Sequence, residues 1–229
     1  RLDRAILVEA LEGIRFDEST LRETAWDPLQ VVQVAGSGLF ALIAREATPW
    51  PQRGTALVHR VAGLPALLDG ARSALGSLPG RPVSLLHTDT ALAQLDGILE
   101  QVDEGLAVAR ATPDGGLGLA DHLAALRPHA AAALASYRRA LEEEIRPYAV
   151  GEGRLGPDLF RQKLRHTLAS DLAPDELVAR ARHDLAAVCA ELVRLAREAG
   201  PAWCPGAAPP AREDELWRGA FDAIAAQHA

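Results

Sequence analysis

Apolar residues recur three or four positions apart along most of the chain, and this spacing is typical of amphipathic helices. The longest run predicts one unbroken helix over 123–148, whose outer face carries Arg138, Arg139 and the acidic run 142–144. A second run of apolar residues, over 177–199, predicts a helix whose first turn contains Pro174 and which stops at Gly200–Pro201. A third predicts a helix over 92–109, which opens near Thr88–Asp89 and ends before a turn-rich segment at 112–116.

Shorter helices are predicted over 4–14, 28–45, 52–61, 65–78, 157–168 and 212–227. No stretch alternates apolar and polar residues over the length of a strand, and alanine, which is frequent here, favours helix. We therefore expect an all-α fold, an irregular multi-helix array with several long antiparallel helices and no sheet. The chain 1–229 is expected to form a single helical domain with a hinge at 200–211, where four prolines oppose helix.

Charge and hydropathy exclude two classes of function. The chain has 24 Lys and Arg against 31 Asp and Glu, a net charge of −7, which argues against nucleic-acid binding. The longest apolar run, 31–44, is too short to span a membrane. The sequence opens at Arg1 without the charged and then apolar pattern of a leader peptide. The location is therefore left open: cytoplasmic, or exported if a leader upstream was removed.

Residues with the chemistry of a metal or catalytic site do not fall into a recognised pattern. A His-Glu-x-x-His helix is absent, and His122 and His129 share a helix face without a carboxylate at the right offset. Cys189 and Cys204 are interpreted as free thiols. We therefore expect neither a catalytic residue nor a bound metal or other cofactor in this chain.

Two further clusters have structural interpretations that we favour over functional ones. Gly36-Ser37-Gly38 lies within helical spacing and indicates close helix packing rather than a phosphate-binding loop. Arg161, Lys163, Arg165 and His166 are the one positively weighted cluster, which suits either an anion or peptide-carboxylate contact or ion pairing with nearby acids. Ion pairing is the favoured interpretation.

Three segments occur together in a familiar order. They are 1–46, with Trp26-Asp27-Pro28-Leu29 and Gly36-Ser37-Gly38-Leu39-Phe40; 86–94, with Leu86-His87-Thr88-Asp89; and 137–177, with Pro147-Tyr148-Ala149 and Asp171-Leu172-Ala173-Pro174. In that order and spacing they resemble the amino-terminal half of the bacterial domain of unknown function 885 (DUF885) family. One departure is Ala173, where the family tends to have a helix-capping Thr.

The resemblance implies a helical protein related to predicted zinc-dependent peptidases of the gluzincin kind, often lipoproteins or secreted proteins. The family's His-Glu-x-x-Pro-Gly-His helix lies in its carboxy-terminal half, and no position here matches it. Zinc is thus expected only in a carboxy-terminal half outside this chain. The candidate substrate contacts are His87, Arg161, Arg165 and His166.

The function that follows is the helical, substrate-channel half of a zinc metallopeptidase-like protein. The alternative is a non-catalytic helical interaction or ligand-binding module, whereas a transcription regulator lacks support because 4–14 is no basic recognition helix. The expected partner is the carboxy-terminal half of the same protein or a second copy, with peptides as candidate ligands. Trp203, Trp217 and Phe221 are the candidate partner face, although the chain's own long helices could also bury them.

Overall fold

The computed structural model describes residues 2–112, 118–203 and 212–228. Helices account for nearly all of the regular structure, and within these ranges the only β feature is an isolated bridge between Ser84 and Gly151. The expected all-α fold is therefore confirmed. The chain falls into two compact units, Arg1–Lys163 and Leu164–Ala229, which are described separately below.

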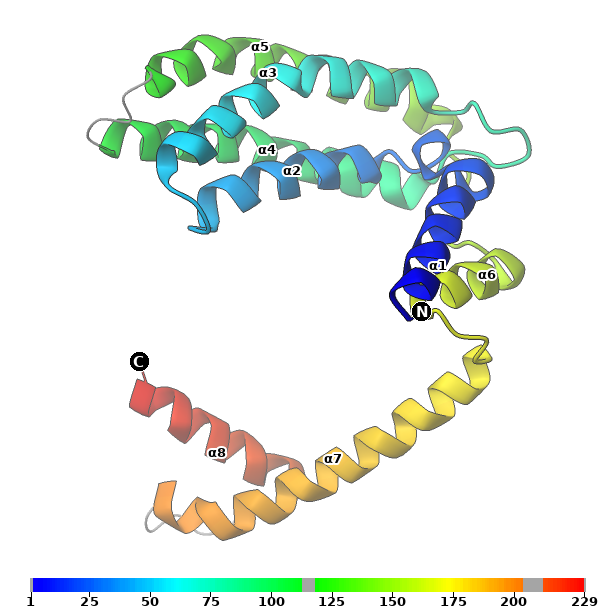
Figure 1. Ribbon diagram of the computed structural model, residues 1–229, viewed down its shortest axis with the longest axis vertical. Coiled ribbons are helices and arrows are strands. Elements are labelled where there is room, and N and C mark those ends of the chain that lie inside the picture. Colours follow the sequence, from blue (N-terminus) through cyan, green and yellow to red (C-terminus); the bar gives the residue numbers. More distant parts are fainter. Residues whose placement is uncertain (1, 113–117, 204–211, 229) are drawn as a thin grey trace. The chain divides into compact units, whose positions relative to one another are not determined.

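The first unit is built on four helices, α2 (Leu29–Ala44), α3 (Trp50–Ala74), α4 (Leu85–Ala111) and α5 (Leu119–Ala140). α2 and α5 each pack against both α3 and α4. Figure 1 shows that α2 and α4 run in one direction and α3 and α5 in the opposite one. The four helices therefore enclose one apolar core, as expected for an array of long antiparallel helices.

Leucine side chains from every helix fill this core, and each is at most 1% exposed: Leu39, Leu57, Leu95 and Leu123. Burial of each such side chain contributes about 1.5–3 kcal/mol. Gly105 of α4 allows α3 to come close, because a Cβ there would lie 2.5 Å from Cδ2 of Leu57. Of the glycines at 36 and 38, Gly38 faces α3, where the Arg60 guanidinium donates to its carbonyl oxygen.

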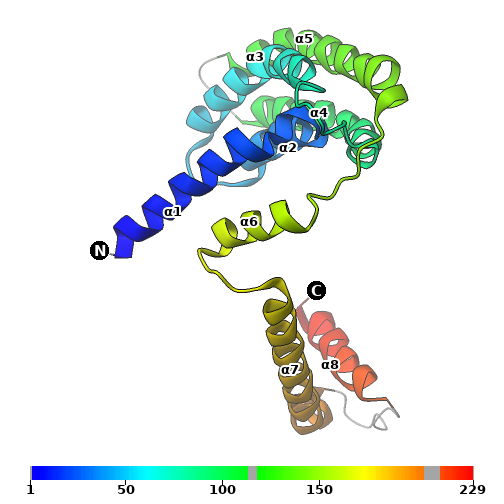
Figure 2. The ribbon, with the colours of Figure 1, turned by 90° about the vertical axis from the view of Figure 1, so that its right-hand side faces the viewer.

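A helix outside the bundle, α1 (Leu2–Phe16), begins the unit and leads into the π-helical turn η1 (Asp17–Leu21) and the short η2 (Glu23–Ala25). Within the described residues of its unit, the α1 helix packs closely against η1 and no other element. It exposes large apolar side chains along its length: Ile6, Leu7, Val8, Leu11 and Ile14, all between 43% and 64% exposed. Figure 2 shows this helix extending away from the four-helix core of its unit.

Several predicted helix boundaries are wrong. α3 is one continuous helix with Pro65 inside it, whereas separate helices were predicted on either side of that proline. Pro65 removes one hydrogen bond, but buried Leu64 and Leu68 anchor the helix around it. α4 begins at Leu85 instead of near residue 88, because the Ser84 side chain caps it by accepting a hydrogen bond from the His87 backbone.

The long helix predicted over 123–148 is also interrupted. After α5 the backbone widens into the π-helical turn η3 (Leu141–Ile145) and then tightens into η4 (Arg146–Tyr148). Pro147 has no N–H to continue the α-helical ladder. Pro147 therefore prevents an α-helix from continuing through η4, and apolar spacing alone does not reveal this.

The boundary between the units lies within α6 (Pro157–Leu168), which matches its predicted range. The second unit then contains α7 (Pro174–Trp203) and α8 (Glu213–His228), which pack against each other with Ala196 and Ala220 buried. The stop predicted at Gly200–Pro201 is wrong, since α7 continues to Trp203. Pro201 has no N–H, so one backbone hydrogen bond is missing near the end of this helix. The rest of the predicted hinge, 204–211, lies outside the described residues.

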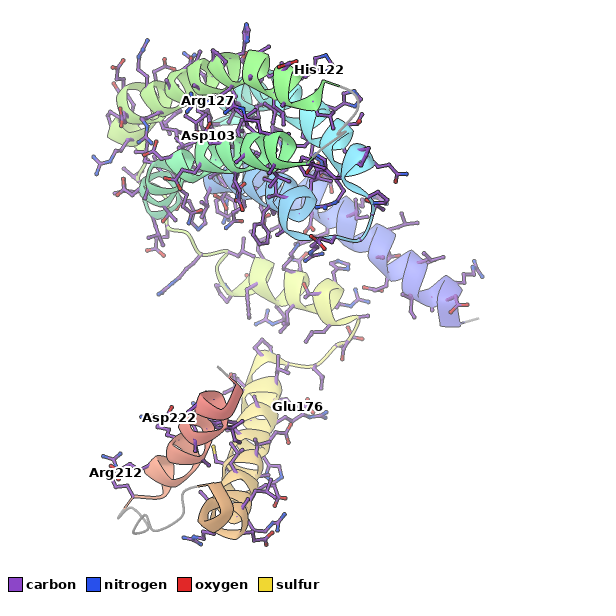
Figure 3. All side chains as sticks on the ribbon, turned by 90° about the vertical axis from the view of Figure 1, so that its left-hand side faces the viewer. Asp103, His122, Arg127, Glu176, Arg212 and Asp222 are labelled. Carbon is purple, nitrogen blue, oxygen red and sulfur yellow. The ribbon has the colours of Figure 1, made fainter. Side chains whose placement is uncertain are left out.

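Ion pairs cover the outer surface of both units. Arg127 of α5 and Asp103 of α4 form a bidentate pair, with Nη2 donating to Oδ2 at 2.8 Å (Figure 3). The hydrogen bonds from Arg127 hold the pKa of the Asp103 carboxyl below its usual range. In the described part of the chain no single helix is long and apolar enough to cross a membrane; only Asp3–Ala25 joined to Leu29–Ala44, bent by 105°, meets that test.

Candidate functional site

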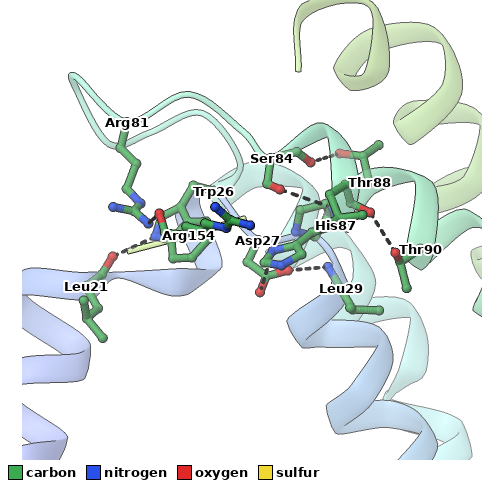
Figure 4. Close-up of polar contacts among 12 residues, drawn as sticks. Leu21, Trp26, Asp27, Leu29, Arg81, Ser84, His87, Thr88, Thr90 and Arg154 are labelled. Carbon is green, nitrogen blue, oxygen red and sulfur yellow. Dashed lines mark hydrogen bonds and ion pairs between the residues drawn. The ribbon is translucent and has the colours of Figure 1, made fainter. Parts of the chain in front are cut away.

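Trp26 is the centre of a group of polar contacts where α2 and α4 begin. Its indole is 2% exposed, and its Nε1 donates to the Leu21 carbonyl oxygen at 2.9 Å. The Arg81 guanidinium lies 3.9 Å from the ring centroid, and the His87 ring stacks on Trp26 at 5.8 Å between centroids. Both contacts use the electron-rich faces of the indole. We call Trp26, Asp27, Arg81 and His87 the Trp26 cluster (Figure 4).

Asp27 links this cluster to α2. One carboxylate oxygen accepts from the backbone N–H of Leu29 at 2.8 Å, which satisfies a free donor at the start of that helix. The other lies 3.1 Å from Nδ1 of His87. That atom pair is close but does not meet hydrogen-bond geometry. The side chains of His87 and Asp27 are 19% and 16% exposed.

Backbone hydrogen bonds fasten three distant segments around the cluster. The Ser84 N–H donates to the Trp26 carbonyl at 2.9 Å, and the Gly151 N–H donates to the Val83 carbonyl at 2.8 Å. Close to these bonds, Gly153 lies against the imidazole, because a Cβ at that position would be 2.8 Å from Nε2 of His87. The segment that follows η4 therefore covers the side of His87 that points away from Asp27.

This arrangement limits what His87 can do. A histidine paired with a carboxylate can act as a base through its second nitrogen when that nitrogen is open to a substrate. Here Nε2 lies against Gly153, and the ring stacks on Trp26. The geometry therefore suits a structural contact better than a catalytic base. This contact holds together the start of α2, the start of α4 and the segment 149–154.

An apolar hollow of about 410 Å³ lies beside this cluster, between the first turns of α2 and the second half of α3. Asp27 and Gln30 lie at its polar side, and its other walls are mostly apolar: Val31, Val34, Ala66, Leu67, Ala71, Leu75 and Tyr137. Val34 and Leu67 are 55% and 38% exposed. Its size and lining are those of small-molecule or side-chain pockets.

Two polar side chains give this hollow its chemistry. The Tyr137 hydroxyl donates to the Pro28 carbonyl oxygen at 3.3 Å, and burial, with a smaller effect of the Asp27 charge, raises the pKa of Tyr137. The phenol therefore stays neutral. The Oε1 of Gln30 is buried and has no hydrogen-bond partner among the described residues. That atom has almost no accessible surface, so an occupant of the hollow does not reach it unless the side chain moves.

The predicted basic residues all lie along α6. Arg161 pairs with Asp158 at 3.1 Å, and Arg165 pairs with Asp171 at 2.7 Å. Lys163 Nζ lies 2.6 Å from both carboxylate oxygens of Asp17. These pairs agree with the ion-pairing interpretation, while the role of Arg161, Arg165 and His166 as substrate contacts stays a prediction.

A neighbouring acid is affected by the same interactions. Burial raises the pKa of Glu23, and the positive charge of Lys163 partly opposes that rise. The charges of Asp17, Asp27 and Arg81 also act on the pKa of Glu23. Glu23 therefore lies within the electrostatic reach of Lys163 on α6 and of the Trp26 cluster. Sequence reasoning missed Trp26, Asp27, Arg81 and Tyr137 as members of a site, although Trp26 and Asp27 stood in the segment that resembled the family.

The predicted partner face is described in part. Phe221 of α8 is 51% exposed, and its ring meets that of Trp217 edge-on at 6.0 Å between centroids. Arg218 lies 5.3 Å from the Trp217 ring centroid. Trp203 is the last residue of α7, and its side chain lies outside the described part. Whether these residues bind a partner stays a prediction.

The donor side chains that the fold brings together bear on metal binding. Within 2–112, 118–203 and 212–228, no group of three or more His, Cys, Asp or Glu residues is placed to hold a metal ion. A zinc site built from the described residues therefore does not fit, and no metal-dependent step is assigned to this chain.

Comparisons with known proteins give a family and a fold. The family model for "bacterial protein of unknown function (DUF885)" matches residues 1–227. A solved structure, that of a protein from Shewanella oneidensis described as a candidate lipoprotein of unknown function, is similar with a TM-score of 0.62 and 18% sequence identity. The match covers 96% of this chain and 39% of that one. No curated protein matches the chain.

Proposed function

This chain belongs to the bacterial DUF885 family, and we propose that it forms the helical half of a metallopeptidase-like protein. In this proposal the chain shapes one wall of a substrate channel. The metal and the catalytic groups belong to a part of the protein that this chain does not include. The chain spans 39% of the length of its solved relative, which supports a role as part of a larger protein.

One observation carries the proposal, the exposed apolar surface of α1. Five large apolar side chains on that helix are between 43% and 64% exposed, and η1 is the element that packs closely against it among the described residues of its unit. A contiguous apolar face of this kind on a helix is unusual unless another surface covers it. Coverage by the remainder of the protein accounts for it without placing any catalytic residue on this chain.

The hollow beside the Trp26 cluster is the proposed contribution of this chain to the substrate channel. Its apolar walls suit the apolar side chain of a peptide. Through Asp27, the Trp26 cluster fixes the start of α2, whose first turns line the hollow. His87 then acts by positioning this wall, without touching the reacting atoms.

The test compares the protein encoded by the whole reading frame with residues 1–229 alone. Each is dialysed, its zinc content is measured by elemental analysis, and it is assayed against a peptide library with and without a chelator. We expect about one zinc per chain and chelator-sensitive cleavage for the whole product, and neither for the 229-residue chain. Leu67→Asp in the whole product, at the rim of the hollow, should raise KM more than it lowers kcat.

A non-catalytic ligand-binding module is the competing function, and the same hollow favours it. If the whole product holds no zinc and cleaves no peptide, while the isolated chain binds apolar amides and loses that binding on Leu67→Asp, the peptidase-like proposal is wrong. The control is Leu86→Asp on α4, because Leu86 is 64% exposed and does not line the hollow. That variant should behave like the parent in every assay.

A further inference from the structure

The α7 helix carries a second apolar surface with a different pattern from that of α1. Apolar residues recur alternately three and four positions apart along it: Val178, Ala181, Leu185, Val188, Leu192, Leu195 and Ala199. This is the a and d pattern of a coiled-coil helix, continued over about three heptads. We call these seven residues the α7 seam.

The α8 helix covers only one side of the α7 seam. Ala196, which follows Leu195 at the flanking e position, is 4% exposed, and α8 is the element that packs closely against α7 in the described part of the chain (Figure 2). Four members of the seam keep large exposed fractions: Val178 47%, Leu185 63%, Val188 55% and Leu195 44%. The open side is therefore the one away from Ala196.

Acidic residues border that open side. Asp184, Glu191 and Glu198 each precede a seam residue by one position, which places them in one row at the flanking g positions. Arg194 forms ion pairs with Glu191 and Glu198 at 2.6 and 2.5 Å. Asp184 has no charged partner within ion-pair distance among the described residues. It is the acid that a partner's cation can reach.

A second copy of the chain is a poor match for this seam. An antiparallel pair would bring one acidic row against the other, and like charges across a coiled-coil seam are unfavourable. A parallel pair would place Asp184 opposite Cys189 and Glu191 opposite Ala196. Ala196 is already covered by α8. Neither arrangement provides a cation for Asp184.

We propose that the α7 seam binds an amphipathic helix with Lys or Arg along the flank that faces Asp184, and that the remainder of the same protein provides this helix. The source rests on the proposed function, in which this chain is one part of a longer protein. The match to only 39% of the solved relative leaves ample length for such a helix. The apolar contacts supply most of the affinity, and the acidic row selects the basic flank.

The probe is a synthetic helix of about three heptads with Leu at a and d and Lys at the flanking positions. A matched peptide carries Glu in place of Lys. Fluorescence anisotropy measures the binding of each to residues 1–229. We expect the Lys peptide to bind at least about tenfold more tightly at low salt, and the difference to shrink at high salt. Equal binding of both peptides, or binding of neither, overturns the proposal.

Three variants separate charge, seam and general effects. Asp184→Lys should reverse the preference so that the Glu peptide binds more tightly. Val188→Asp should abolish the binding of both peptides. Ala190→Asp is the matched control, because Ala190 is exposed on the opposite side of α7, and it should change nothing. A reversal of preference cannot arise from simple unfolding.

Other occupants of the seam give different results. If Val188→Asp lowers the melting temperature by several degrees and Ala190→Asp does not, the seam belongs to the chain's own core and the proposal fails. If sedimentation shows dimers that Val188→Asp abolishes, a second copy occupies the seam. The whole product should not bind the Lys peptide, because its own helix covers the seam. Binding there as tight as in residues 1–229 would assign the seam to another protein, whatever the zinc and cleavage assays show.

Discussion

His87 and Asp27 show what single residues contribute and how far the sequence reveals it. Both stood in segments that resembled the family, yet sixty positions separate them and nothing in their spacing pairs them. The pairing depends on the Ser84 N–H bonding to the Trp26 carbonyl, which brings the start of α4 beside the start of α2. Tyr137 is buried on α5, and its contact with Pro28 is also long-range. Residue types were readable from the sequence, and their tertiary partners were not.

Gly153→Ala tests whether the 149–154 segment really packs on His87. The new Cβ would lie 2.8 Å from Nε2, so the ring or the backbone must move, and overpacking of this kind costs about 1–3 kcal/mol. Urea denaturation should show that loss. In a His87→Ala background the same change should cost much less, because the obstructing ring is gone.

The control for this prediction is Gly97→Ala in α4. A Cβ at Gly97 meets nothing within 4 Å, so the substitution should leave stability unchanged or raise it by up to about 1 kcal/mol through helix propensity. Equal losses for Gly153→Ala in the presence and absence of the imidazole would show that the glycine is needed for another reason.

Helix existence was predictable from apolar spacing, whereas helix ends depended on single polar or proline residues. The ranges of α2, α6 and α8 agree with prediction to within about two residues. α3 passes through Pro65, whereas Pro147 lies in η4, where the helical run after α5 and η3 ends. Prolines thus have opposite outcomes in the two segments. Buried leucines hold α3 together, while the residues after α5 turn towards Val83.

Ser84→Ala tests the N-terminal cap of α4, a helix that was predicted to start near residue 88. Ser84 is 0% exposed, and its hydroxyl accepts from the His87 N–H at 3.2 Å. Loss of the cap should lower the free energy of unfolding by about 1–2 kcal/mol, measured by urea denaturation. Thr90→Ala is the control, because Thr90 is partly exposed and its side-chain hydrogen bond stays within its own helix, so it should cost no more than about 0.5 kcal/mol. Similar losses for both variants would mean that Ser84 does not set the start of α4.

At the scale of the molecule, α1 and α7 each expose an apolar surface, whereas the four-helix core is well filled. The four-helix core buries its leucines almost completely, while α1 and α7 leave theirs exposed. The sequence predicted such a surface but located it on α8 and the segment before it. The helical pattern shows which residues share a face, but it cannot show which of two apolar faces the neighbouring helix will cover. Here α8 buries Ala220 against α7 and leaves Phe221 half exposed.

The double variant Trp217→Ser with Phe221→Gln tests the face on α8. Trp217 is partly buried and Phe221 is 51% exposed, so the tryptophan should account for most of any drop in melting temperature. A loss of about 1 kcal/mol corresponds to roughly 2–4 °C for a chain of this size. If Phe221 belongs to a partner face, Phe221→Gln alone should reduce self-association in sedimentation or weaken binding to the remainder of the protein, with little change in melting. If the double variant melts several degrees lower and associates as the parent does, both rings belong to the α7–α8 core, and α8 provides no partner face.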